Sequence, residues 1–307
     1  MILCCGEALI DMLPRRTGDG AACFQPFAGG AVFNTAIALA RLGAPAAMFT
    51  GLSTDLFGTQ LADALTGAGV STQFIHRSDR PTTLAFVELT DGQARYAFYD
   101  ENTAGRMLTE ADLPALPHDL RALFFGGISL AVTPCADTYR ALMLRAAPDH
   151  VTMIDPNIRP GFIKDEAAYR ARLDPMLRAA DIVKLSDEDL SWLMGPGEIA
   201  DLAAQVRALG PKLVCITEGA KGAWGFTAHD VEFVAATRVT PVDTVGAGDT
   251  FNAGILAALD EAGALDKVAL DMLDSDTLRA ALSLAARAAA VTVSRAGANP
   301  PTRAELP

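Results

Sequence analysis

Short apolar runs alternate with segments of helical periodicity along most of the chain. Runs of the first kind include "MILCCGEAL", "ALFFGGI", "VTMIDPN", "DIVKLS" and "KLVCITEG". A buried run followed by an amphipathic segment, repeated several times, is typical of parallel strands joined by crossover helices. The sequence therefore predicts an α/β fold in which helices cover both faces of a mostly parallel sheet.

Two segments interrupt this alternation. The first, "IDMLPRRTGDGAACFQPFAGG", is polar and broken by Gly and Pro, and it reads as a short hairpin or a loop that leaves the main body. The second, "TTLAFVELTDGQARYAFY", has two β-like runs around "TDGQ", which is typical of a β-hairpin. We expect residues of about 12–27 and 72–100 to form a small β-sheet, within a single domain that spans residues 1–307.

Composition and charge exclude several classes of protein. The chain has 307 residues and a formal net charge of −12, so we expect no nucleic-acid partner, because phosphate binding requires a basic surface. It has no apolar run of about 18 residues and no basic leader, so we expect no membrane segment, no signal peptide and a cytoplasmic location. The five cysteines and four histidines do not have the spacing of a transition-metal site.

The stretch "DTVGAGDTF" at 243–251 places a carboxylate at the start of a predicted helix. The amides of Gly246, Ala247 and Gly248 are expected to point outward there, as at other helix starts that bind anions. Phosphoryl transfer needs charge stabilisation and a proton acceptor, which these amides and Asp249 can supply. An isolated Asp at this position would more often be a helix cap. The helix dipole predicts a lowered pKa for Asp249.

Three other polar residues follow strand-like runs directly. They are Asp155, Ser186 and Thr217. Ligands of open α/β sheets bind at the carboxyl ends of the strands, so we expect these residues and the 243–249 stretch to lie along one edge of the sheet.

Three strings together resemble the ribokinase-like sugar kinases of the PfkB family. They are "AGGAVFNTAIALARLG" followed by "TGLSTDLFG", then "TEGAKGAWG", and last "DTVGAGDTFNAGI", and they span residues 28 to 255 in the family's order. Neither a Walker A motif nor a Rossmann fingerprint is present. The resemblance implies a ribokinase-like three-layer sandwich, with a small β-sheet lid over the sugar, and an enzyme that uses ATP and Mg²⁺.

The resemblance also implies roles for residues around the acceptor sugar. Asp249 is the base that takes the proton from a sugar hydroxyl, and the 246–248 amides hold the moving phosphoryl group. Sugar hydroxyls are held by Asp11, Gly29, Gly30 and Asn34.

On the nucleotide side the resemblance implies contacts from Lys184, Ser186, Thr217, Gly219, Gly222, Gly248 and Ala286. The family often has an N-x-x-E motif linked to Mg²⁺, and here Ser186 and Asp189 stand for its Asn and Glu, with Glu188 as an alternative carboxylate. Asp243 and Val245 lie where many members bind a monovalent cation such as K⁺.

The substrate is expected to be D-fructose, because "GEALIDMLP", "RYAFYDENTA" and "DPNIRP" look like bacterial fructokinases. Phe98 then packs on the sugar, and Arg159 lies near the sugar or the phosphates. The rival substrate is 2-keto-3-deoxygluconate, whose carboxylate could pair with Arg95, Arg106 or Arg159, and another sugar or nucleoside kinase of the family is a further alternative. The alternative outside the enzymes is a silent sugar- or nucleotide-binding protein. Lids of related kinases often pair, so the resemblance implies a homodimer through the lid.

Overall fold

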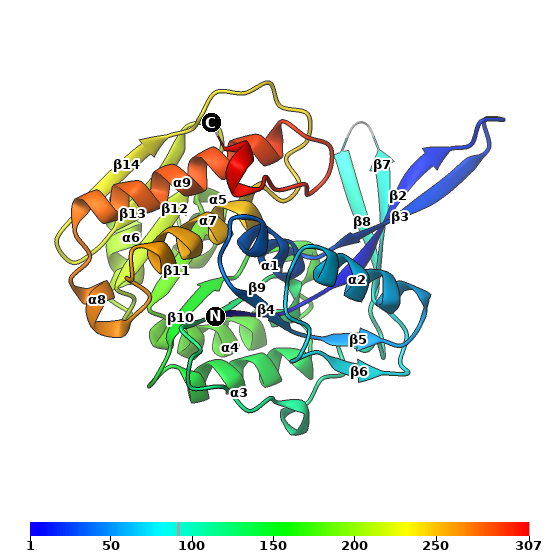
Figure 1. Ribbon diagram of the computed structural model, residues 1–307, viewed down its shortest axis with the longest axis horizontal. Coiled ribbons are helices and arrows are strands. Elements are labelled where there is room, and N and C mark those ends of the chain that lie inside the picture. Colours follow the sequence, from blue (N-terminus) through cyan, green and yellow to red (C-terminus); the bar gives the residue numbers. More distant parts are fainter. Residues whose placement is uncertain (91–92, 307) are drawn as a thin grey trace.

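The computed structural model describes residues 1–90 and 93–306, and the side chains of residues 88–96 lie outside that description. Its main sheet has eight strands in the order β14-β13-β12-β11-β10-β9-β1-β4 (Figure 1). The strands are β1 (Ile2–Cys5), β4 (Ala46–Phe49), β9 (Ala122–Gly126), β10 (Val151–Asp155), β11 (Ile182–Ser186), β12 (Leu213–Thr217), β13 (Gly222–Phe226) and β14 (Val231–Ala235). The six strands from β4 to β12 are parallel, whereas β13 and β14 are antiparallel at one edge. The predicted fold class is confirmed.

Helices cover both faces of this sheet. One face carries α1 (Ala31–Arg41), α2 (Leu56–Gly67), α7 (Ala247–Glu261), α8 (Lys267–Asp271) and α9 (Ser275–Val293). The other carries α3 (Cys135–Ala146), α4 (Glu166–Ala179), α5 (Asp187–Met194) and α6 (Ile199–Arg207). Short 3₁₀ helices lie at η1 (Glu110–Asp112), η2 (Ile128–Leu130), η3 (Pro160–Phe162) and η4 (Arg303–Glu305).

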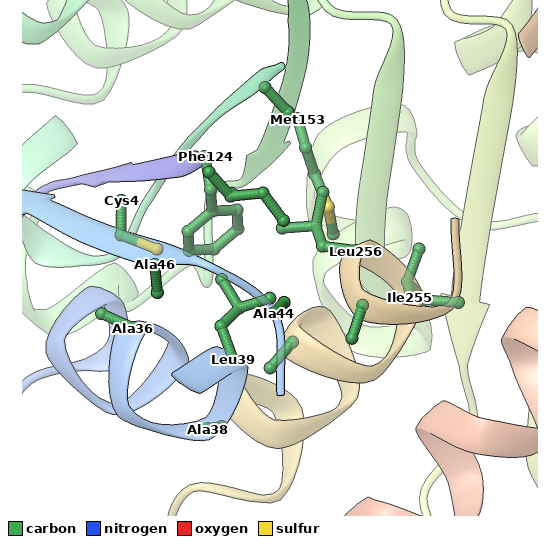
Figure 2. Packing of buried hydrophobic residues seen from close by; sticks show 14 of the residues in the cluster. Cys4, Ala36, Ala38, Leu39, Ala44, Ala46, Phe124, Met153, Ile255 and Leu256 are labelled. Carbon is green, nitrogen blue, oxygen red and sulfur yellow. The ribbon is translucent and has the colours of Figure 1, made fainter. Parts of the chain in front are cut away.

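The two faces of the sheet bury two separate hydrophobic cores. Successive side chains of a strand point to opposite faces, so Phe124 of β9 enters the core beneath α1 and α7, and its neighbour Phe125 enters the core beneath α3 and α4. Figure 2 shows Leu39 of α1 and Leu256 of α7 gathered around Phe124. Within the described residues, no helix has the length and apolar character needed to cross a membrane.

A four-stranded sheet stands off one end of the main body (Figure 1). Its order is β3-β2-β7-β8, from β2 (Leu9–Arg16), β3 (Ala22–Gly29), β7 (Leu84–Thr90) and β8 (Gln93–Tyr99). The two segments expected to form a small sheet supply these strands, although the turn residues Asp91 and Gly92 of "TDGQ" lie outside the described residues.

The region around residues 46–78 differs from the expected pattern. The run "PAAMFTGLS" reads as one strand, but it forms two, β4 in the main sheet and β5 (Gly51–Ser53) beside it. β5 pairs with β6 (His76–Ser78), so residues 76–78 do not join the four-stranded sheet.

Candidate active site

A cavity of about 850 Å³ lies at the carboxyl ends of the central strands. Asp155 ends β10, Ser186 ends β11 and Thr217 ends β12, and all three line the cavity together with Asp249 of α7. The prediction that these segments share one edge of the sheet is confirmed. Because β2 and β8 contribute Asp11 and Phe98, the four-stranded sheet forms part of the cavity wall.

Asp249 lies in the first turn of α7 and is 8% exposed. Its Oδ2 accepts a hydrogen bond from Nδ2 of Asn34, at 2.9 Å, and its carbonyl oxygen accepts one from Oγ1 of Thr35, at 3.2 Å. Both partners belong to α1, so the two helices meet at this carboxylate. The residue expected to bind sugar, Asn34, therefore also contacts the expected base.

The lowered pKa predicted for Asp249 is wrong. Burial raises the pKa of this carboxyl to about 7, and the hydrogen bond from Asn34 and the ammonium of Lys184 only partly offset that effect. The nearby carboxylates of Asp155 and Glu7 raise the pKa further. Removal from water outweighs the helix dipole here, because a dipole is worth much less than the hydration of a buried charge.

The start of α7 leaves backbone donors available. The residue before the helix, Gly246, has the left-handed conformation, with φ of 79°. The amide of Ala247 donates to the carbonyl of Thr244 at 3.3 Å, which differs from the expectation that it points outward. Within the described residues, the amides of Gly248 and Asp249 have no hydrogen-bond partner. These two amides, rather than the amide of Ala247, can hold an anion.

A buried cation lies beside these amides. The Nζ of Lys184, on β11, is 3.0 Å from Oδ2 of Asp155, and a side-chain Cβ at Gly248 would lie 3.3 Å from that Nζ. Burial alone would lower the pKa of Lys184, but the carboxylates of Asp155, Asp189 and Asp249 raise it. The ammonium therefore stays charged at neutral pH, where it can stabilise a phosphoryl group held at the helix start.

Asp155 also binds the amide of Asn252, whose Nδ2 donates to its Oδ2 at 2.7 Å. The Oδ1 of Asn252 is buried and has no partner among the described atoms. Asn252 lies one turn after Asp249 on α7, so this bond fixes the helix to the end of β10.

The expected sugar-binding residues form one side of the cavity. Asp11 is held against Gly29, where a Cβ would overlap its carboxylate, and burial raises the pKa of Asp11 to about 6. Phe98 from β8 meets Phe162 from η3 edge-on, with ring centroids 4.6 Å apart, and both rings line the cavity. This contact joins the four-stranded sheet to the main body.

The three candidate arginines are in different surroundings. Arg159 is exposed and lines the cavity, where its Nη1 donates to the carbonyl of Ile158. Arg106 is not among the lining residues, and its Nη1 pairs with Asp100 at 3.1 Å. The side chain of Arg95 lies outside the described part of the chain. Of the arginine side chains that the structure describes, Arg159 is therefore the candidate at the cavity.

On the nucleotide side, Lys184, Ser186, Thr217 and Gly219 line the cavity. Ser186 and Asp189 form a capping box at the start of α5, and Oδ1 of Asp189 also accepts from the amide of Ile158 at 3.1 Å. Asp189 therefore serves as a helix cap. The neighbouring carboxylate of Glu188 lines the cavity and bonds to no other described residue.

Five of the predicted site residues are not among those that line the cavity: Gly29, Gly222, Asp243, Ala247 and Ala286. Gly222 has no room for a Cβ against the backbone of Val234, so its glycine is needed for the packing of β13 on β14. Ala286 belongs to α9, which packs along α7. Asp243 ties two loops together, because its carboxylate accepts from the amides of Val245 and Gly297.

Sequence reasoning missed several residues of the cavity region, among them Glu7, Phe162 and Asn252. Glu7 and Phe162 line the cavity. The signal for Glu7 is a lone carboxylate in the apolar run "CCGEAL", since a charge in a buried strand end needs a partner.

The fold and the site define a sugar kinase. Residues 1–305 match the pfkB family of carbohydrate kinases, and the chain belongs to this family. A fructokinase from Rhizobium leguminosarum bv. trifolii is 55% identical over 279 residues, which cover 91% of this chain and 86% of that protein.

Two solved structures are similar over most of their length. The structure of fructokinase from Xylella fastidiosa with bound ATP has a TM-score of 0.89 at 31% identity, and covers 100% of this chain and 94% of that one. The structure of fructokinase from Vibrio cholerae O395 in a form with fructose, ADP and calcium ion bound has a TM-score of 0.83 at 27% identity, and covers 97% and 94%.

Proposed function

We propose that this chain transfers the terminal phosphoryl group of ATP to D-fructose and forms fructose 6-phosphate and ADP. One observation carries the proposal: a buried carboxylate, with a pKa raised to about 7, stands at a helix start whose next amides are open. The fructokinases named above, one of which binds fructose and ADP, support fructose as the acceptor.

In the proposed reaction, the 6-hydroxyl oxygen of fructose attacks the γ-phosphorus of ATP. The bond from the γ-phosphorus to the oxygen that bridges it to the β-phosphate breaks, and that oxygen leaves with ADP. The hydroxyl proton passes to the carboxylate of Asp249, which must be ionised at that moment. The amides of Gly248 and Asp249 and the ammonium of Lys184 stabilise the charge on the moving phosphoryl group.

The cavity suits a divalent cation. Its described lining carries the acidic residues Glu7, Asp11, Asp155, Asp187, Glu188, Asp189 and Asp249, against the bases Arg159 and Lys184. ATP is itself an anion, so it needs a cation here, and oxygen donors suit Mg²⁺. Glu188 would hold it through its carboxylate, because Asp189 is used as a helix cap. When bound, Mg²⁺ neutralises charge on the β- and γ-phosphates.

The remaining features of the proposal rest on the sequence resemblance. The four-stranded sheet would close over the sugar as a lid and exclude water that would otherwise hydrolyse ATP. A K⁺ ion near Asp243 and Val245, a homodimer through the lid and a cytoplasmic location stay predictions.

The test is a coupled ADP-release assay with Mg-ATP over fructose, ribose, tagatose, 2-keto-3-deoxygluconate and adenosine, with Asp249→Asn as the blank for contaminating kinases. Fructose should give a kcat/KM at least about tenfold above every other acceptor. Turnover of the acid sugar alone would overturn fructose as the substrate, and Arg159→Ala would then show whether Arg159 binds its carboxylate. Turnover of none of the five would contradict the proposal.

A further inference from the structure

Glu7 is a buried carboxylate that the proposed reaction does not use. It follows β1, is 9% exposed and lines the cavity. Burial raises the pKa of Glu7, although hydrogen bonds from the amides of Ser129 and Ala31 act in the opposite direction. Burying a carboxylate costs free energy unless hydrogen bonds compensate it, so the hydrogen-bond partners of Glu7 indicate its role.

The first partner of Glu7 is the start of helix α1. The residue before this helix is Gly30, which has no side chain to cap it. Instead, Oε1 of Glu7 accepts from the amide of Ala31 at 3.0 Å, and the main-chain carbonyl of Glu7 accepts from the amide of Phe33 at 3.2 Å. A residue 24 positions earlier in the chain therefore caps the helix twice.

The second partner of Glu7 is the short helix η2. Its Oε2 accepts from the amide of Ser129, in η2, at 3.2 Å. Gly127, just before η2, has a φ of 71°, and a Cβ there would overlap the carboxylate. Gly127 thus lies against the carboxylate of Glu7, and Gly30 lies against its main-chain carbonyl and Cγ. The carboxylate joins α1 to η2 with one oxygen bonded to each.

We propose that Glu7 is a positioning residue for the phosphoryl transfer: it fixes the first turn of α1, and through it places the Asn34 amide on the carboxylate of Asp249. The chain of contacts is continuous, from the Ser129 and Ala31 amides through Glu7 and one turn of α1 to the 2.9 Å bond between Asn34 and Asp249. The proposal rests on the proposed function, because it assigns a role within that reaction.

The test is a double-mutant cycle of Glu7→Gln and Asn34→Ala, measured as kcat/KM for the accepted sugar. Glutamine has the size of glutamate, but its NH₂ must face one of the two backbone N–H groups, so one bond is lost and the link between α1 and η2 is broken. Glu7→Gln alone should lower kcat/KM about 10- to 100-fold, because small displacements of positioning groups cost that much. In the Asn34→Ala background the same change should cost less than about threefold. Equal losses in both backgrounds, or a loss under about twofold in the wild type, would overturn the proposal.

A second variant keeps the test valid if Glu7→Gln does not fold. Gly127→Ala pushes a methyl group at the intact carboxylate, and Gly69→Ala is its matched control, since Gly69 also has positive φ but nothing near its Cβ. Gly127→Ala should lower kcat/KM at least about tenfold more than Gly69→Ala, and equal effects would count against Glu7.

Hydrogen exchange of the first turn of α1, measured without any substrate, separates this proposal from the proposed function. Glu7→Gln should speed exchange there, and Asn34→Ala should not. Unchanged exchange in Glu7→Gln would refute the positioning role of Glu7, even if the wild type phosphorylates fructose. If the wild type is inactive on fructose but Glu7→Gln still exchanges faster, Glu7 fixes the first turn of α1 and fructose is not the substrate.

Discussion

Helices α1 and α7 begin in the same cavity, and each follows a glycine of positive φ, yet their first amides are used differently. At α1 the amides of Ala31 and Phe33 are both bonded to Glu7. At α7 the amides of Gly248 and Asp249 have no partner among the described residues. A helix start whose amides are largely bonded within the protein can support other groups, whereas one whose amides are open can bind an anion. The comparison indicates that α7, rather than α1, meets the phosphoryl group.

The largest effect should come from the carboxylate at the open helix start. Asp249→Asn removes the proton acceptor, so kcat should fall by at least about two to three orders of magnitude while ATP still binds. Steady-state kinetics and nucleotide titration measure the two effects. Asp260→Asn, at the far end of α7, is the control and should keep the activity. An Asp249→Asn variant with near-normal kcat would refute the assignment of the base.

The same substitution should stabilise the fold at alkaline pH. The pKa of Asp249 is about 7 in the folded protein, against an ordinary value of 3.8. Between these two pH values the folded state holds a proton that the unfolded chain has lost. Stability from this group is therefore present below about pH 4 and is lost as the pH rises through about 7. Above pH 7 a buried charge remains, and asparagine removes it. Asp249→Asn should have a higher Tm than the wild type at pH 8, and a lower Tm would contradict this.

A smaller effect is expected when the open amides are obstructed. Gly248→Ala places a methyl group 3.3 Å from Nζ of Lys184, inside the space for the phosphoryl group. We expect kcat to fall about 10- to 100-fold, which is less than the roughly 100- to 1,000-fold loss on removing an oxyanion donor, because the methyl group obstructs the amides but leaves them in place. Gly67→Ala is the control, because that glycine of α2 has open space around it. Equal activity of the two variants would show that the start of α7 does not meet the substrate.

The smallest effect concerns a third helix start, that of α5. Glu188→Gln should raise the Mg²⁺ concentration for half-maximal rate by a few fold, with little change in kcat at saturating Mg²⁺. Asp189→Asn should instead lower Tm, because it weakens the capping box and the bond to Ile158. Reversed results for the two variants would return the metal contact to Asp189.

Much of the fold could be predicted from the sequence because periodicity is a local signal. The alternation of buried runs and helices gave the central parallel sheet, and each strand end placed its polar residue at the cavity. Strands β2 and β3 were harder to predict, because Pro14 and Pro26 lie within them. Pro26 is tolerated in the edge strand β3, and Pro14 lies beyond the part of β2 that pairs with β7.

The site was less predictable where its properties depend on tertiary contacts. The pKa of Asp249 follows from burial between α1 and α7, which the string "DTVGAGDTF" does not reveal. Similarly, the cap of α1 is Glu7, whereas local rules look for a cap in the residue before the helix. Motifs identified Asp249 and Asn34 separately, but their hydrogen bond required the fold.

The pH dependence of kcat/KM for fructose tests the central claim most directly, because this ratio reports the ionisation of groups in the free enzyme and free substrate. Asp249 must be ionised to accept the hydroxyl proton, so activity should be low at acid pH, rise with a midpoint near pH 7 and level off above it. In Asn34→Ala the midpoint should move to higher pH, because the hydrogen bond that lowers the pKa of Asp249 is gone. A wild-type profile that stays flat from pH 8 down to about pH 5 would contradict a buried Asp249 as the base.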